Sequence, residues 1–135
     1  MRKMFLTLSV ILSSLLVVQC NSGDKALALH QKLSEMAKEL NASTPVMLDR
    51  YTRFDEASVT QDNVFRYRYT VLNTANPDSL VQQMSQSLTE NIRQEFSTNS
   101  QLRIFRDNHV IIEYIYQDED NLIIRTLRIE PEDYQ

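Results

Sequence analysis

The chain has 135 residues, of which 42% are hydrophobic and 24% charged, with one Cys, one Gly, three Pro and no Trp. This length favours a single domain, and the composition excludes collagen-like, disulfide-rich and wholly disordered chains. The formal net charge is −4. Nucleic-acid-binding proteins gain affinity when basic side chains release counterions from phosphates, so this acidic chain is not expected to bind nucleic acid.

The first 20 residues have the pattern of an export signal. Arg2 and Lys3 form a basic start, and residues 4–18 are an uncharged, largely apolar run. That length suits the apolar region of a signal peptide and is short for a membrane span, which needs about 20 apolar residues. Residues 1–20 are therefore predicted to be a signal peptide that places the mature protein in the periplasm or cell envelope, or outside the cell. An uncleaved N-terminal anchor would also place the domain outside the cytoplasm.

The single cysteine, Cys20, stands where the apolar run ends. This position resembles the lipobox of bacterial lipoproteins, in which the cysteine is acylated and becomes the first mature residue. Gln19 departs from that pattern, because its position normally holds Gly, Ala or Ser. Two alternatives stay open: lipid attachment at Cys20, as in an outer-membrane lipoprotein, or ordinary signal-peptidase cleavage near residues 20–23. No cysteine follows for a disulfide or a cysteine-ligated metal site.

Residues 21–24 are predicted to be a short polar tether, and residues 25–40 a helix that Asp24 caps and Pro45 follows. Five apolar residues of this helix recur at helical spacing on one face: Leu29, Leu33, Met36, Ala37 and Leu40. Residues 46–55 then read as a strand of mixed character, and residues 56–63 as a polar connection.

Residues 64–72 are the clearest predicted strand. Alternation places one group of side chains on one face: Phe65, Tyr67, Tyr69 and Val71. Arg66, Arg68 and Thr70 point to the other face. We expect the helices to cover the aromatic face, because the opposite arrangement would expose a long aromatic strip.

A second helix is predicted from Asn76-Pro77-Asp78 to near Ser97, because a capping residue, a proline and an acid start it. Its apolar residues recur every four positions: Leu80, Met84, Leu88, Ile92 and Phe96, with Val81 alongside. Residues 100–106 are predicted to add a helical turn that buries Leu102 and Phe105.

Residues 109–116 and 122–130 are predicted to be two strands of a hairpin, and residues 131–135 a polar tail. Since the connecting turn lacks Gly, Asp or Asn is expected at any left-handed position. Residues 25–130 would thus form one α+β domain. We predict a two-layer sandwich of helix-strand-strand-helix-strand-strand order, with two long helices on a four-stranded, mainly antiparallel sheet.

Short motifs spread over most of residues 27–130 carry a family resemblance. They are Leu40-Asn41 and Pro45; Leu48, Asp49, Thr52, Arg53 and Phe54; Tyr67, Tyr69, Thr70, Val71 and Asn73; and Phe105-Arg106-Asp107-Asn108 before Tyr114 and Tyr116. In these motifs the chain resembles a group of small exported Gram-negative bacterial proteins to which no activity is assigned. The resemblance implies export and the two-layer fold, and it implies no catalytic residues. A vaguer likeness, in size, export and α/β make-up, links the chain to pilotins, the small outer-membrane lipoproteins that escort secretins.

The sequence offers no recognisable catalytic set, cofactor motif or metal site. It lacks a G-x-S-x-G elbow and Gly-rich phosphate loops, and nothing brings His30 to His109 with a carboxylate such as Glu113. The acidic run Asp118-Glu119-Asp120 reads as a solvated turn. An enzyme, which would need a cleft with perturbed acids or bases, is therefore the least favoured class, and no cofactor is expected.

A candidate binding surface comes from the arginines of the predicted sheet. Arg66 and Arg68 point the same way, and Arg53 and Arg125 lie on the first and last strands. Arginine is enriched at protein interfaces, although an ordinary solvated face with cross-strand ion pairs would look the same. We hypothesise an envelope binding or adaptor module that recognises another envelope protein through this face or an edge strand. The alternative hypothesis is an inhibitor or immunity-type protein that blocks an exported enzyme.

Overall fold

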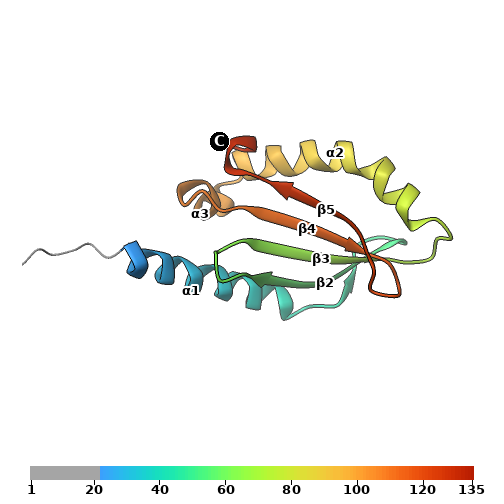
Figure 1. Cartoon of the computed structure of the whole chain (residues 1–135), viewed down its shortest axis with the longest axis horizontal. Coiled ribbons are helices and arrows are strands. Elements are labelled where there is room, and N and C mark those ends of the chain that lie inside the picture. The colour runs from blue at the N-terminus through green and yellow to red at the C-terminus, as the bar shows by residue number, and fades with distance from the viewer. Residues whose placement is uncertain (1–21) are drawn as a thin grey trace, which may run out of the picture.

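The structure, a computed structural model, describes residues 22–135. Its helices are α1 (Ser22–Asn41), α2 (Pro77–Thr98) and α3 (Arg103–Asp107), with 3₁₀ turns η1 (Ser100–Leu102) and η2 (Pro131–Asp133). Its strands are β1 (Val46–Met47), β2 (Thr52–Val59), β3 (Phe65–Val71), β4 (Ile112–Gln117) and β5 (Ile123–Ile129) (Figure 1). The predicted signal peptide and Cys20 lie outside the described residues.

The strands form one five-stranded sheet in the order β1-β2-β3-β4-β5. The β2–β3 and β4–β5 pairs are antiparallel, as their short connections predicted, and β1 pairs antiparallel with β2. The central pair, β3 and β4, is parallel, since α2 and α3 carry the chain back to the same end of the sheet. The α+β class and the two long helices are confirmed, and η1 with α3 forms the helical turn predicted over residues 100–106. The count of four strands was wrong, because residues 22–135 form five.

The N-terminal strand of the sheet is divided differently from the prediction of one strand over residues 46–55. The chain leaves β1 after Met47, and the Asp49 carboxylate closes a turn by accepting hydrogen bonds from the N–H groups of Tyr51 and Thr52. Strand β2 then runs to Val59, through residues expected to be a polar connection. Its register shifts between Phe54 and Glu56, and this irregularity hides the alternation that would have predicted the strand.

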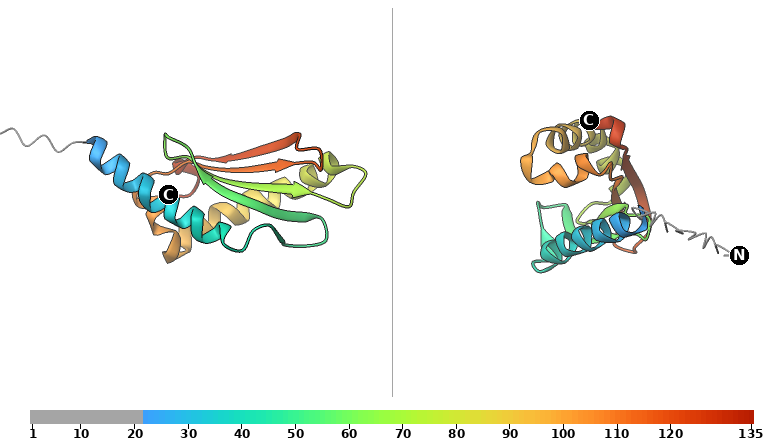
Figure 2. Two further views of the ribbon diagram at one scale, coloured as in Figure 1. Left: turned by 90° about the horizontal axis from the view of Figure 1, so that it is seen from below. Right: turned by 90° about the vertical axis from the view of Figure 1, so that its left-hand side faces the viewer.

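Both long helices pack on the same face of the sheet (Figure 2). Helix α1 lies against β2 and buries Leu33 and Ala37, and α2 lies against β5 and buries Ile92 and Phe96. The two-layer arrangement is therefore confirmed, with the core between the layers. No helix of residues 22–135 is both long and apolar enough to cross a membrane.

The ends of the elements bring further corrections. Helix α1 already begins at Ser22, so Asp24 lies in its first turn and is not its cap, and Asn76 makes no side-chain cap to α2. His109 precedes β4 with a positive φ and does not begin a strand. Asn121 takes the left-handed position of the last hairpin, as predicted for Asp or Asn.

The C-terminal residues 131–135 do not form a polar tail. They fold as η2, and the Tyr134 side chain is only 1% exposed. Its hydroxyl contacts the carbonyl oxygens of Phe105, at 3.2 Å, and Val110. Tyr134 therefore ties the end of the chain to the segment around α3, where Phe105 is fully buried as predicted.

Candidate binding groove

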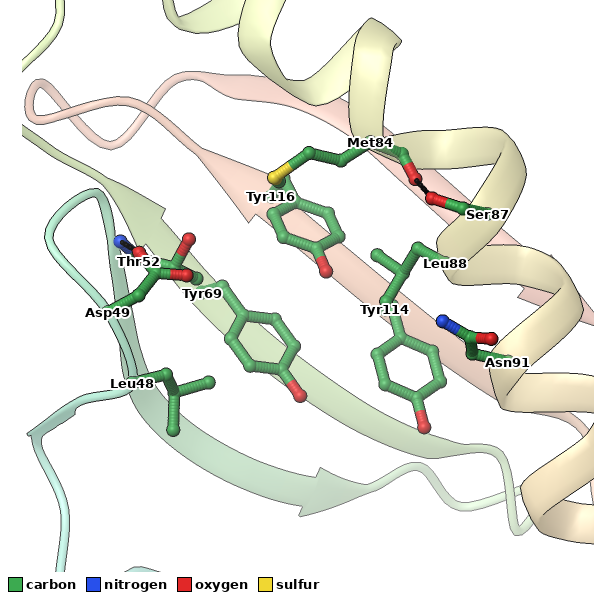
Figure 3. Close-up of a pocket in the computed structure, with 10 residues that line it drawn as sticks. All are labelled: Leu48, Asp49, Thr52, Tyr69, Met84, Ser87, Leu88, Asn91, Tyr114 and Tyr116. Carbon is green, nitrogen blue, oxygen red and sulfur yellow. Dashed lines mark hydrogen bonds between the residues drawn. The ribbon is translucent and has the colours of Figure 1, made fainter.

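The two long helices lie over opposite edges of one face of the sheet (Figure 2). A pocket of about 320 Å³ lies on this face, with tyrosines of β3 and β4 as its floor and α2 and the β1–β2 loop as its walls. We call it the tyrosine groove (Figure 3). Its lining residues are Leu48, Asp49, Thr52, Tyr69, Met84, Ser87, Leu88, Asn91, Tyr114 and Tyr116.

The floor belongs to a row of four stacked tyrosines, of which Tyr69, Tyr114 and Tyr116 line the groove. Tyr67 continues the row outside the lining. The parallel register pairs Tyr67 with Tyr114 and Tyr69 with Tyr116. Their ring centroids are 4.8 and 5.1 Å apart, with 17° and 16° between the ring planes. Aromatic pairs of this kind add about 0.5–1.5 kcal/mol each beyond their area burial, so the row is a preorganised surface.

The hydroxyls of these tyrosines are available to a binding partner. Among the tyrosines of residues 22–135, the one whose hydroxyl bonds to a protein group is Tyr134. No fully buried polar side-chain atom of these residues lacks a partner. The four hydroxyls of the row therefore reach solvent, and those of Tyr69, Tyr114 and Tyr116 point the same way (Figure 3). Burial raises the pKa of each tyrosine of the row, that of Tyr116 to about 12. They remain neutral at physiological pH and can donate and accept hydrogen bonds.

The helical wall of the groove comes from the four-residue apolar repeat of α2. Because a repeat of four drifts around a helix of 3.6 residues per turn, its members face different surroundings. Ile92 and Phe96 are buried in the core, whereas Met84 and Leu88 are partly buried and line the groove. The drift of the four-residue repeat thus explains how one helix contributes to both the core and the groove.

The opposite wall is an exposed apolar lip on the β1–β2 segment. Val46, Met47 and Leu48 are 38%, 47% and 58% exposed. Of these three, Leu48 lines the groove, and Asp49 follows it in the lining. Leu48 therefore adds exposed apolar surface to this wall of the groove.

The other face of the sheet is polar, and it holds three of the four predicted arginines. Arg66 pairs with Glu113 at 3.2 Å, Arg68 with Glu56 at 2.7 Å, and Arg53 with Asp55 at 2.5 Å. These are the cross-strand and local ion pairs of an ordinary solvated face, which was the alternative interpretation of the arginines. A binding role for them stays a prediction.

Arg125 does not join the other three arginines. Strand β5 places it opposite Tyr116, on the helix side of the sheet, where it donates to the Ser85 hydroxyl of α2 at 3.2 Å. Arg128 takes its place on the polar face, within 3.8 Å of Glu113.

The histidines and the acidic hairpin turn are engaged in structural contacts. His30 lies 2.9 Å from the side-chain oxygen of Asn63, and His109 contacts Gln135. Asp118 accepts hydrogen bonds from the N–H groups of Asp120 and Leu122 at the hairpin turn. No group of three or more potential ligating side chains occurs in the part of the chain that the structure describes.

Comparison with protein families assigns the chain to a family. A family model described as "Domain of unknown function (DUF8479)" matches residues 28–125. The chain belongs to this family. A search of curated proteins found no match.

Three solved structures share the fold of this DUF8479 protein. A Pseudomonas aeruginosa protein assigned as secreted has a TM-score of 0.70 at 18% identity, over 82% of this chain and 96% of that one. The pilotin EpsS of the Vibrio vulnificus type 2 secretion system has a TM-score of 0.64 at 16% identity, over 84% and 97% of the two chains. The type II secretion system pilotin AspS of Vibrio cholerae has a TM-score of 0.61 at 14% identity, over 83% and 97%. The predicted resemblance to exported bacterial proteins and pilotins is confirmed, and at these identities it shows a shared fold.

Proposed function

We propose that the protein is a non-catalytic binding module of the cell envelope, and that its tyrosine groove takes a segment of another envelope protein. The observation that carries this proposal is the row of stacked tyrosines, whose hydroxyls are free at the floor of a pocket lined by Met84 and Leu88. Tyrosine supplies a large, rigid contact area at low entropic cost, together with a polar group, which is why it is enriched at binding sites.

The groove is a better docking surface than the arginine face. Arg53, Arg66 and Arg68 already have carboxylate partners, so a protein docking there would have to replace existing ion pairs. The tyrosine hydroxyls and the exposed Leu48 have no such competitors in the described chain. Binding in the groove therefore buries apolar surface, and it replaces hydrogen bonds to water without breaking an ion pair of the described chain.

The fold comparison supports an envelope partner. Two of the similar structures are pilotins of type II secretion systems, so components of a secretion system are the first partners to test. This step rests on analogy between folds, because function is carried by sites and not by folds. A partner that proves to be an exported enzyme, inhibited on binding, would favour the inhibitor alternative.

We also propose that residues 1–20 direct export. Lipid attachment at Cys20 and ordinary signal-peptidase cleavage remain the two alternatives. A lipid anchor would add a diacylglyceryl group to Cys20 and would make it the first residue of the mature chain. Cleavage by signal peptidase would leave a lipid-free N-terminus near residues 20–23. The intact mass of the protein recovered from its cells separates the two outcomes.

A blocking substitution tests the groove. Ser87 is exposed, lines the groove and makes its side-chain hydrogen bond only to the carbonyl oxygen of Met84 in its own helix. Ser87→Trp should fill the groove without disturbing the core and should abolish co-purification of the partner. Gln86→Trp is the matched control, since Gln86 is exposed and borders a hollow between α2 and β5. If both variants retain the partner, the groove is not the docking site.

A further inference from the structure

Two carboxylates lie at the tyrosine groove: Asp49 belongs to its lining, and Glu95 follows the lining residue Asn91 on α2. Asp49 belongs to the β1–β2 loop, and its charge raises the pKa of Tyr116. Glu95 lies on α2 one turn beyond Asn91, and its charge contributes to the raised pKa of Tyr114. Both side chains are exposed, so they are accessible to a molecule that enters the groove.

The Asp49 carboxylate is held in place by one oxygen, and its other oxygen can accept hydrogen bonds from a binding partner. One oxygen, Oδ1, accepts hydrogen bonds from the N–H groups of Tyr51 and Thr52 at 2.7 and 2.8 Å. Its other oxygen accepts none from residues 22–135, and the acid takes part in no ion pair there. The neighbouring Arg50 lies over the Tyr51 ring, with its guanidinium carbon 5.5 Å from the ring centroid.

Glu95 has the same character on α2. Its Oε1 accepts a hydrogen bond from the Asn99 amide at 2.6 Å, which fixes the side chain along α2. It also forms no ion pair within the described residues. Arg93, the basic residue nearest to it on α2, is engaged with Asp133 at 3.2 Å.

We propose that the segment bound in the tyrosine groove is basic as well as apolar. It carries aliphatic side chains that pack on Met84, Leu88 and Leu48, and lysine or arginine side chains that meet Asp49 and Glu95. The inference deepens the proposed function and rests on it. Its basis is charge complementarity: two unpaired carboxylates border the groove, and the phenol oxygens between them can also accept hydrogen bonds from a cation.

The acidity of the rest of the protein acts in the same direction. Residues 22–135 hold 12 Lys or Arg and 18 Asp or Glu, which is the full count of 14 and 18 without Arg2 and Lys3, so their formal net charge is −6. This charge attracts a basic segment and repels an acidic one during encounter. The carboxylates at the groove then select among basic segments.

The test uses the full-length protein as it is recovered from the cells that produce it, together with a display library of random peptides. Peptides that bind the protein but not its Ser87→Trp variant define the groove-dependent set. This set should be rich in Lys or Arg next to aliphatic residues. Asp49→Asn with Glu95→Gln removes both charges while keeping oxygens that can accept the hydrogen bonds described above.

The double variant should bind the selected peptides about tenfold more weakly, since each exposed ion pair of this kind changes an affinity by about 1.5- to 5-fold. The loss should shrink at high salt, which screens exposed charges. The matched control is Glu35→Gln with Glu39→Gln, two exposed acids of α1, a helix that contributes no residue to the groove lining. This pair should leave the affinity unchanged.

Two results would overturn the inference while leaving the proposed function intact. One is a groove-dependent set of neutral or acidic peptides. The other is an equal loss of affinity in the groove variant and in the control pair, which would show that net charge alone attracts the peptides. If no groove-dependent peptide is found, the proposed function fails, and this inference fails with it.

Discussion

The ring of Tyr67 stacks on that of Tyr114 with their centroids 4.8 Å apart. The contact exists because β3 and β4 run parallel and in register, although 47 residues separate the two tyrosines. The same pairing repeats two residues later between Tyr69 and Tyr116. The central parallel pair of strands is therefore the feature that assembles the floor of the tyrosine groove.

Two substitutions of Tyr114 should separate its stacking from its hydroxyl. Tyr114→Phe keeps the ring and removes a hydroxyl that has no protein partner among the described residues, so the free energy of unfolding should change by less than about 0.5 kcal/mol. Tyr114→Ala should cost about 3–5 kcal/mol, because it removes a buried ring from the stack. Urea unfolding measures both changes in free energy. Equal losses of stability in the two variants would show that the Tyr114 hydroxyl is not free.

Asn41 should contribute more to stability than its place at the end of a helix indicates. Its side-chain amide donates to the carbonyl of Ala57 at 2.8 Å and accepts from the N–H of Ala57 at 2.7 Å. Asn41→Ala would leave both groups of a 3%-exposed residue unpaired and should cost about 2 kcal/mol.

The exposed Ser43 provides the control for Asn41. Its hydroxyl donates to the carbonyl of Leu40 at 3.3 Å, so Ser43→Ala should change the free energy of unfolding by less than about 0.5 kcal/mol. Similar urea midpoints for the two variants would mean that the Asn41 contacts to β2 do not anchor α1.

The sequence predicted the elements better than it predicted their pairing. The helical periodicity of Leu29 and Leu33, and the start signal at Asn76-Pro77, are local and identified α1 and α2 correctly. Strand order is not local, and the extra residue at the Phe54–Glu56 irregularity broke the alternation that marks a strand. The sequence also gave no sign of the contact between Asn41 and Ala57, because a polar residue near a proline predicts a turn.

The groove could be predicted only in part. The spacing of two in Tyr67 and Tyr69, and in Tyr114 and Tyr116, was a signal that each pair shares a face. That face was correctly assigned to the helix side, where Phe65 and Val71 are buried. What the sequence did not reveal is the pocket, which forms because the helices pack towards β2 and β5. Arg125 was grouped with the other arginines because its face depends on a pairing register that the sequence does not reveal.

Alkaline pH should destabilise the fold through its buried tyrosines. Burial raises the pKa of Tyr134 from 10.0 to about 12, so the folded state holds its proton more tightly than the unfolded chain does. This stabilisation is complete below pH 10 and should be lost as the pH rises from 10 through 12. The urea midpoint should fall across this window.

The variant Tyr134→Phe measures how much of the loss of stability at alkaline pH comes from Tyr134. It loses the hydroxyl contacts to Phe105 and Val110, so it should be less stable at neutral pH, and its urea midpoint should fall less steeply above pH 10. An unchanged slope would show that Tyr134 is not among the groups responsible.

The polar face provides a discriminating pair of substitutions. Arg66→Gln with Arg68→Gln removes two charges that are neutralised by Glu113 and Glu56. The groove proposal predicts that this double variant still captures the envelope partner, with stability changed by about 1 kcal/mol or less, since exposed ion pairs contribute little. Loss of capture with the fold intact, shown by circular dichroism, would move the docking site to the arginine face.

Site-specific photo-cross-linking in the source cells tests the groove most directly. A photoreactive residue replaces Ser87, in the groove, or Gln86, its exposed neighbour outside the groove lining. The proposal predicts that position 87 cross-links to one dominant envelope protein, and that position 86 does not. Equal cross-linking from both positions, or none from position 87 in a folded and abundant protein, would contradict binding in the tyrosine groove.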